Sequence, residues 1–467
     1  ILLLQFVLLT ATLKVALSGV VIYKLFLQIP ELPKVDLQEY WGPDGVESKD
    51  VSIRPYRIVF GDAMQEEMRT RFEFYRRAEQ EQRTKSYKTA AWNYGVNPEN
   101  FAEFIAEWIF SYKFKERTKF LNQFDQFKTN IQGLDIHFLR VKPKLDGKQK
   151  VLPLLLLHGW PGSVREFYEA IPKLTTPRKG YDFVFEVIAP SLPGFIFSDA
   201  PTRPGMSGIH VAVVMRNLMR RIGHTKFYVQ GGDYGHVIGS NMATLFPDEI
   251  LGFHTNMAVN FSKLATLTWL LGGLWPSLIE NRVPERMYPV SERLKFYLEE
   301  SGYFHLQSTK PDTIGAVLQD APVGLAAYIL DRFMVATDPA NKNDTIGGLT
   351  EFYSGEKLLD NIMLYWASGS IMTAMRHYKE NWNNPDELIM KEIPTKVPTW
   401  ALRLRHELFY QPDFILRWKY TNFIGGFTSD VGGHFAAFER PKMFSDDVFR
   451  AVDYFIKFKA LGGEIPK

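Results

Sequence analysis

Short apolar segments alternate with longer amphipathic ones through the middle of the chain. Apolar runs cover residues 151–157, 183–189 and 226–230, and each is bounded by Gly, Pro, Asn or Asp. Residues 131–141 alternate in polarity around a turn signal at Gly133, which predicts a hairpin at the edge of a sheet. This rhythm of strand, helix and strand predicts a mainly parallel sheet with helices on both faces, where ligands bind beyond the carboxyl ends of the strands.

Helical patterns precede the sheet and also interrupt it. Residues 28–130 are mixed, charged and aromatic, and we expect an N-terminal helical extension with helices at residues 62–83 and 98–128. The β rhythm disappears again between residues 261 and 391, which predicts an inserted helical cap. Within this cap, helices are expected at residues 284–301, 312–333 and 358–380.

The sheet rhythm returns after the cap. Strands are expected at residues 397–404 and 422–428, and an amphipathic helix at residues 445–461 closes the chain. The expected fold class is therefore α/β, with a core built from residues 131–260 and 392–467 on either side of the cap. At 467 residues, the chain is long enough to bury such a core and to carry insertions.

The beginning of the chain is apolar. Residues 1–27 contain only Gln5, Lys14, Lys24 and scattered Thr and Ser among apolar residues, and as a helix they would span a hydrocarbon core about 30 Å thick. A lysine at the centre of such a span costs roughly 2.5–3.5 kcal/mol, which the surrounding Leu, Val, Ile and Phe can offset. We therefore expect residues 1–27 to be a membrane anchor. The alternative, a cleaved signal peptide, lacks a clean small-residue cleavage site.

Composition narrows the functional classes. The net charge is only +3, and Lys and Arg are interspersed with Asp and Glu, so nucleic acid is not an expected partner. The chain has no cysteine, which excludes disulfides, thiolate metal sites and a cysteine nucleophile but leaves the redox compartment open. Residues 264–279 are nearly uncharged, and we expect a buried cap segment or tunnel wall there rather than a membrane contact.

A turn with the pattern small-x-acid-x-small follows the apolar run at residues 226–230. Its sequence is GGDYG, with Asp233 at the centre, and a helical pattern begins directly after it. A nucleophile on a sharp strand-to-helix turn needs small flanking residues, because larger side chains would collide with the strained backbone. The positive end of the following helix also stabilises a carboxylate. We therefore predict that Asp233 is a nucleophile; the alternative is a glycine-rich turn in which this aspartate only caps the helix.

The apolar run at residues 151–157 leads into the sequence HGWPG, at the position where the loop after a strand can hold an oxyanion. We expect the backbone N–H groups of Trp160 and Tyr234 to form that oxyanion hole. A cis peptide bond is expected between Trp160 and Pro161. For His158, we expect a structural role in which the ring bonds to the backbone of the loop.

The general base should be a histidine on a loop after the last strand. His434 lies there, within a Gly-Gly-His-Phe sequence. In hydrolases of this architecture the chain order is nucleophile, acid and histidine, so the acid should precede the histidine. Glu407 follows the strand expected at residues 397–404 and is the predicted acid, with Asp413 and Asp430 as alternatives.

An aspartate nucleophile restricts the reaction. A carboxylate that attacks an ester or amide gives a mixed anhydride, whereas attack on saturated carbon gives an ordinary ester that a His and Glu pair can hydrolyse with water. The substrate must therefore carry a leaving group on carbon, and an epoxide also needs a proton donor for its alkoxide. Tyrosines of the cap could supply that proton, and they are Tyr303, Tyr328, Tyr353, Tyr365 and Tyr378.

With these residues assembled, the whole chain resembles the microsomal epoxide hydrolase family. The segments that carry the resemblance include WGP at residues 41–43, SIRP at residues 52–55, GLDIHF at residues 133–138, HGWPG at residues 158–162 and GGHFAAFE at residues 432–439. The resemblance implies an α/β-hydrolase fold and an enzyme held in the endoplasmic reticulum membrane by its N-terminal anchor.

The resemblance also assigns roles. It implies that the nucleophile is Asp233, the base His434 and the acid Glu407. By the sequences SGY and HYKEN, it places the two acid-donating cap tyrosines at Tyr303 and Tyr378.

The sequence departs from the family at Tyr234, where Trp is common. Because this residue contributes chiefly its backbone N–H, the change should alter the shape of the pocket rather than the chemistry. The pattern is closer to the insect branch of the family, the juvenile hormone epoxide hydrolases, which implies a long apolar terpenoid epoxide as substrate; no cofactor or metal is expected. Two alternatives remain: a haloalkane dehalogenase, which needs halide-binding N–H donors, and a non-catalytic lipid or hormone carrier on the same fold.

Overall fold

The computed structural model describes residues 23–45, 50–80, 87, 89–145, 147, 149–345 and 347–463. The membrane anchor predicted at residues 1–27 lies outside these described residues except for η1 (Tyr23–Leu27), a short π-helix. Among the described residues, we find no helix with both the length and the apolar character needed to cross a membrane.

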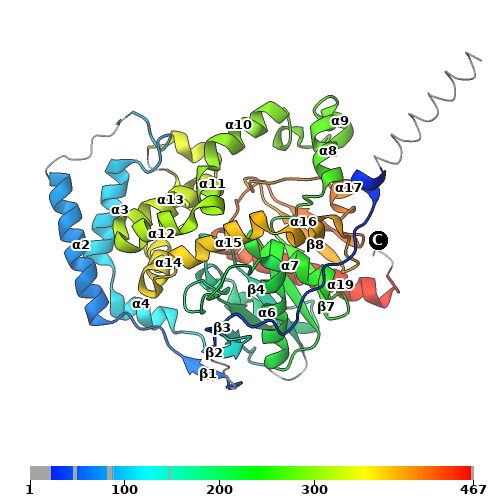
Figure 1. The fold of residues 1–467 in the computed structure, drawn as a ribbon, viewed down its shortest axis with the longest axis horizontal. Coiled ribbons are helices and arrows are strands. Elements are labelled where there is room, and N and C mark those ends of the chain that lie inside the picture. Colours follow the sequence, from blue (N-terminus) through cyan, green and yellow to red (C-terminus); the bar gives the residue numbers. More distant parts are fainter. Residues whose placement is uncertain are drawn as a thin grey trace, which may run out of the picture.

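A nine-stranded sheet runs through the centre of the described structure, in the order β1-β2-β3-β5-β4-β6-β7-β8-β9 (Figure 1). Strands from β5 through β4 to β9 pair in parallel, whereas β1, β2, β3 and β5 pair antiparallel. The predicted mainly parallel sheet is thus confirmed. The strands are β1 (Arg54–Tyr56), β2 (Gln126–Ile131), β3 (Leu134–Val141), β4 (Lys150–Leu157), β5 (Phe183–Pro190), β6 (Phe227–Gly231), β7 (Ile250–Thr255), β8 (Thr399–Arg403) and β9 (Phe423–Thr428).

The predicted hairpin is also present, and it joins β2 to β3. Ile131 pairs with Leu134 across a two-residue turn formed by Gln132 and Gly133. Both turn residues have positive φ, 52° and 88°, which gives the chain the tight reversal that suits the twist of the two strands.

The structure differs from the predicted elements before the sheet and at two of its strands. The helix predicted at residues 98–128 is wrong in its second half: α3 (Pro98–Ser111) and α4 (Phe114–Leu121) are separate, and β2 begins at Gln126. The hydrophobic pattern also misses β1 and β7. β1 has only three residues, one of them Pro55, and β7 contains Gly252 and His254, so neither shows a continuous apolar run.

Helices cover both faces of the sheet. Gly239 of α7 (Tyr234–Leu245) lies so close to Phe253 that a Cβ atom would stand 2.5 Å from the ring. Phe253 lies on β7, and its neighbour there, Gly252, is closer still to Phe455 of α19 (Pro441–Ala460), since a Cβ atom at Gly252 would stand 2.2 Å from that ring. Because adjacent strand residues face opposite sides, α7 and α19 cover opposite faces of the sheet.

Between β7 and β8, the described residues contain helices and no strand, as the predicted cap requires. Two predicted cap helices are divided, because Pro322 begins a new helix and Gly369 ends one in the left-handed conformation, with φ of 64°. The third begins later than expected, at Val290. The main cap helices are α10 (Val290–Glu300), α11 (Gly302–Thr309), α12 (Pro311–Asp320), α13 (Pro322–Thr337), α14 (Gly355–Ser368), α15 (Ile371–Asn383) and α16 (Pro385–Glu392).

The prediction of a buried segment at residues 264–279 is wrong. This segment forms α8 (Lys263–Gly272) and α9 (Pro276–Ile279), which stand out at one edge of the cap (Figure 1). Trp275 is 64% exposed and Leu278 78% exposed. The apolar character of the segment therefore does not arise from burial within the described structure.

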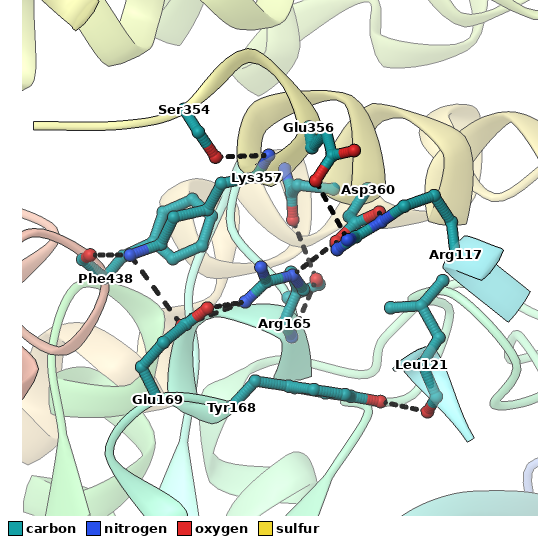
Figure 2. A network of polar contacts seen from close by, with 12 residues as sticks. Arg117, Leu121, Arg165, Tyr168, Glu169, Ser354, Glu356, Lys357, Asp360 and Phe438 are labelled. Atoms are coloured by element: carbon teal, nitrogen blue, oxygen red, sulfur yellow. Dashed lines mark hydrogen bonds and ion pairs between the residues drawn. The ribbon is translucent and has the colours of Figure 1, made fainter. Parts of the chain in front are cut away.

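The N-terminal extension braces the cap against the core. α2 (Asp62–Gln80) contacts α13, and α3 contacts α14 (Figure 1). Between these layers lies the polar network shown in Figure 2, which centres on the fully buried Asp360 of α14. Its carboxylate accepts hydrogen bonds from Tyr112 (3.1 Å), from Arg117 Nε (2.9 Å) and Nη2 (2.5 Å), and from Arg165 Nε (2.9 Å). One carboxylate therefore joins the extension, the core and the cap.

Replacing the Asp360 carboxylate should lower the free energy of unfolding of the protein. Asp360→Asn leaves the buried guanidinium of Arg165 and the partly buried one of Arg117 without their shared counter-charge, and we expect a loss of about 3–5 kcal/mol in the free energy of unfolding, measured by urea denaturation. Glu356→Gln is the matched control, since Glu356 contacts Arg117 at 3.0 Å from a site 49% exposed. That change should cost less than about 1 kcal/mol, and equal losses in both variants would contradict the central role of Asp360.

Candidate active site

The turn after β6 places Asp233 in a strained conformation. Its φ is 51° and its ψ is −124°, a region that side chains other than glycine rarely occupy. The flanking glycines are required by close contacts: a Cβ at Gly231 would lie 2.1 Å from Gly235 O, and one at Gly235 would lie 2.1 Å from Leu157 O. The chain thus holds the carboxylate at the start of α7, where the turn is too tight for larger neighbours.

The loop after β4 brings a donor to this carboxylate. The backbone N–H of Trp160 donates to Asp233 Oδ1 at 2.9 Å, and the backbone N–H of Tyr234 also donates to the Asp233 carboxylate. Gly159 permits this approach, since a Cβ there would lie 2.3 Å from Asp233 Oδ1. The expected cis peptide between Trp160 and Pro161 is present. The two predicted oxyanion donors therefore converge on one carboxyl group.

His158 has the surroundings expected of a structural histidine. Its Nδ1 lies 3.0 Å from the carbonyl oxygen of Gly159, and its Nε2 accepts a hydrogen bond from the backbone N–H of Leu192 at 3.2 Å. Burial lowers the pKa of His158 to about 4, so the ring is neutral at physiological pH.

His434 lies between two carboxylates. Its Nε2 is 3.4 Å from Asp233 Oδ2, and its Nδ1 is 2.9 Å and 3.1 Å from the two carboxylate oxygens of Glu407. Glu407 lies in the loop after β8, and His434 in the loop after β9. Of the alternative acids, Asp413 instead pairs with Arg403 at 2.5 Å. The three residues therefore form a continuous chain of nucleophile, imidazole and acid.

The negative charge of Asp233 and the positive charge of His434 each stabilise the other. Burial alone would raise the pKa of Asp233, but His434 and the N–H groups of Trp160 and Tyr234 lower it below its ordinary value. Burial alone would lower the pKa of His434, but the charges and hydrogen bonds of Glu407 and Asp233 raise it well above its ordinary value. The free site therefore holds an ionised nucleophile beside an imidazolium.

The cap tyrosines fall into two groups. Three of the five have other hydrogen-bond partners: Tyr328 donates to Gln307, Tyr353 contacts the hydroxyl of Thr337, and Tyr365 donates to the backbone of Gly162.

The other two cap tyrosines hydrogen-bond to each other. Tyr303 stacks on the Trp160 ring with 5.4 Å between centroids, and Tyr378 meets the same ring edge-on at 5.7 Å. Burial raises the pKa of Tyr303 to about 12 and raises the pKa of Tyr378 well above its ordinary value, so both keep their protons. The pair predicted as proton donors thus lies directly over the oxyanion loop.

A cavity of about 540 Å³ reaches Asp233 and His434 from the cap side. Tyr303 also faces it, whereas Tyr378 is not part of the cavity wall. The remaining wall is largely aromatic and apolar, with Phe296, Tyr297, Phe304, Trp382, Leu408 and Phe409. Such a cavity can enclose a long apolar molecule and present one of its carbon atoms to the carboxylate.

Three polar residues near Asp233 were not predicted from the sequence. Gln230, Asn256 and Glu166 line a second, small cavity behind the nucleophile. Asn256 directly follows β7, so recognising that strand would have drawn attention to it. Across the residues that the structure describes, no group of three or more His, Asp or Glu side chains is arranged to hold a metal ion.

Comparison with known proteins defines the family. Residues 53–167 match the family described as "Epoxide hydrolase N terminus", and residues 153–294 match "alpha/beta hydrolase fold". The juvenile hormone epoxide hydrolase of Bombyx mori is 47% identical over 453 residues, which cover 96% of this chain and 97% of the relative. The chain belongs to the epoxide hydrolase family. Epoxide hydrolase 1 of Oryctolagus cuniculus is 38% identical and covers 88% of this epoxide hydrolase and 92% of its own length.

A solved structure supports the same assignment. The crystal structure of the silkworm juvenile hormone epoxide hydrolase superimposes on this epoxide hydrolase with a TM-score of 0.86 at 46% identity, and it covers 91% of this chain and 100% of the silkworm chain. The α/β-hydrolase fold and the enzyme class expected from the sequence are therefore confirmed. The relatives are epoxide hydrolases, which decides against a haloalkane dehalogenase and a non-catalytic carrier.

Proposed function

We propose that this epoxide hydrolase converts a long apolar terpenoid epoxide, of the juvenile hormone type, to a vicinal diol. The observation that carries the proposal is the aromatic cavity of about 540 Å³ that opens onto Asp233. The names of the similar insect enzymes point to the same substrate class.

The substrate class can be tested by comparing a juvenile hormone with styrene oxide, a small aromatic epoxide. Each buried CH₂ contributes about 0.8 kcal/mol, so kcat/KM for diol formation should be about 10-fold or more higher for the terpenoid. Rapid turnover of styrene oxide without turnover of the hormone would reject the terpenoid substrate and leave the enzyme class in place.

The first step is alkylation of Asp233. A carboxylate oxygen attacks one epoxide carbon, and the bond between that carbon and the epoxide oxygen breaks, which leaves an ester on Asp233 and a developing alkoxide. The hydroxyl of Tyr303, which is hydrogen-bonded to Tyr378, donates to that alkoxide. Because burial holds the pKa of Tyr303 at about 12, its proton is present when the alkoxide forms.

Loss of the two tyrosine hydroxyls should slow ester formation. We expect Tyr303→Phe to lower its single-turnover rate about 10-fold to 100-fold, and the double variant with Tyr378→Phe to lower it about 10³-fold, since a positioned acid contributes about 10²–10⁴-fold. Tyr328→Phe removes a hydroxyl that donates to Gln307 and should keep a rate close to that of the unmodified enzyme. Equal rates in all of these variants would reject the assignment of the proton donors.

The second step is hydrolysis of the ester. Alkylation removes the negative charge of Asp233, and with it one of the interactions that raise the pKa of His434. The imidazolium therefore gives up its proton, which returns through solvent to the Tyr303 phenolate left by the first step. The neutral imidazole then accepts a proton from water, which attacks the ester carbonyl while the N–H groups of Trp160 and Tyr234 stabilise the oxyanion. Collapse of this intermediate releases the diol, which takes the proton from His434.

We also propose that the enzyme is attached to the endoplasmic reticulum membrane by residues 1–27. Supporting this, η1 at the end of the apolar segment contacts α8, and both carry exposed apolar side chains. On α8, α9 and the turn between them, these are Leu270, Leu271, Leu274, Trp275 and Leu278. Such a surface is suited to rest on the lipid next to an anchor.

Co-sedimentation with phosphatidylcholine vesicles tests this attachment. The full chain should sediment with vesicles, a chain lacking residues 1–22 should bind weakly through α8 and α9, and Trp275→Ser with Leu278→Ser in that shortened chain should abolish binding. A full chain that stays in the supernatant, or that fractionates away from microsomes in cells, would reject the membrane proposal.

A further inference from the structure

A second cavity lies on the core side of Asp233. It has about 20 Å³ of space, which is enough for one water molecule. Asp233 and His434 form part of its wall together with Gln230 and Glu166, and no residue of the cap faces it. The substrate cavity reaches the same Asp233 and His434 from the cap side, so the two cavities meet these groups from different directions.

Gln230 lines this small cavity, and its amide oxygen is an acceptor without a hydrogen-bond partner among the described residues. The residue lies on β6 and is 1% exposed. Its Nε2 donates to Asn256 Oδ1 at 2.9 Å, and Asn256 Nδ2 in turn donates to the backbone oxygen of His434 at 3.0 Å. These two bonds determine which way the Gln230 amide points. Its Oε1 is left buried without a hydrogen-bond partner among the described residues.

An unpaired buried carbonyl is costly, by about 1–3 kcal/mol, and a water that donates to it removes that cost. The network that orients Gln230 also accounts for a glycine of the turn. A Cβ at Gly232 would lie 2.5 Å from Asn256 Nδ2, so a larger residue there would displace the amide that holds Gln230 in place. The second glycine of the turn, Gly232, is therefore needed for this network.

We propose that Gln230 is a positioning residue, which holds the water that hydrolyses the ester on Asp233. The inference rests on the covalent route proposed above. The water donates one hydrogen to Gln230 Oε1 and the other to His434 Nε2, which leaves a lone pair directed at the ester carbonyl carbon.

The chemical step is balanced without a further reactant. The water oxygen forms a bond to Asp233 Cγ while one water proton moves to His434. The bond between Cγ and the alkyl oxygen then breaks, and the departing alkoxide takes that proton from His434 to complete the diol. The second water proton remains on the new Asp233 carboxyl group and passes to His434, which restores the carboxylate beside the imidazolium. Because the water is held on the core side, the alkyl group of the ester can stay in the cap cavity while the water attacks the carbonyl carbon.

Gln230→Met tests the proposal, because methionine keeps the length of the side chain but has no comparable acceptor. We expect ester formation, followed in a single turnover, to proceed at a rate close to that of the unmodified enzyme. Hydrolysis should slow about 10-fold to 100-fold, so the covalent ester accumulates during turnover and is seen by intact-protein mass spectrometry. Gln230→Glu keeps an acceptor oxygen and should hydrolyse the ester faster than Gln230→Met.

Gln126→Met is the matched control, since Gln126 is a buried glutamine on β2 that bonds to His137, away from both cavities. It should lower stability without accumulation of ester. Equal slowing of both steps in Gln230→Met would overturn the role of Gln230, as would an absence of accumulated ester when His434→Gln does accumulate it. If neither variant accumulates ester, the covalent route itself is wrong.

Discussion

Asp233→Asn should abolish epoxide hydrolysis while leaving the fold intact. Asparagine keeps the size of the side chain and an oxygen for the Trp160 N–H, but its amide is a poor nucleophile toward saturated carbon. Removal of a catalytic nucleophile costs about 10⁴–10⁶-fold in rate, so kcat for diol formation should fall by at least about 10⁴-fold. The measurement is product formation with a terpenoid epoxide, together with circular dichroism to verify folding.

Asp413→Asn is a suitable control for this experiment. Asp413 was an alternative acid on sequence grounds, but its side chain is 51% exposed and pairs with Arg403. Its replacement should leave kcat close to that of the unmodified enzyme. Substantial turnover by Asp233→Asn, in a preparation free of the unmodified enzyme, would show that the carboxylate does not attack the substrate.

His434→Gln should separate the two steps of the reaction. Attack on the epoxide needs the Asp233 carboxylate, whereas hydrolysis of the ester needs a base for the water. We expect the covalent ester to form and its hydrolysis to slow by about 10²–10⁴-fold, which intact-protein mass spectrometry detects as the mass of enzyme plus substrate. Steady-state turnover should fall by a similar factor, because hydrolysis becomes the slow step.

The control is His224→Gln, which removes another histidine paired with a carboxylate, Glu186, at 3.2 Å. No ester should accumulate in that variant. If His434→Gln forms no ester but folds normally, His434 is needed for the first step, and the division of roles between Asp233 and His434 is wrong.

Much of the catalytic arrangement can be predicted because short sequence motifs and the order of the strands indicate it. Glycines flanking an acid between a strand and a helix indicate a sharp turn that carries a nucleophile, and the positions of Glu407 and His434 follow from the strands that precede them. The structure places these three side chains in contact. Their spacing in the sequence could not show that contact, since it depends on neighbouring strands in the sheet.

The parts that could not be predicted depend on tertiary surroundings. The helical spacing of apolar residues predicts one helix at residues 98–128, because nothing in the nearby sequence shows that Gln126 pairs with Leu139 of a later strand. The exposure of Trp275 on the cap could not be predicted either, since apolar residues at helical spacing look the same whether protein or lipid covers them. Gln230 looks like an ordinary strand residue, and its unpaired oxygen is apparent only beside Asn256 and His434.

The covalent role of Asp233 is tested most directly by a single turnover in ¹⁸O-labelled water, with enzyme in excess over epoxide. We expect the label to enter the carboxylate of Asp233, where mass spectrometry of the peptide that contains it can detect the label, while the diol of this first turnover carries only unlabelled oxygen. If the label instead enters the diol in the first turnover and the Asp233 peptide remains unlabelled, water attacks the epoxide directly and the ester mechanism is contradicted.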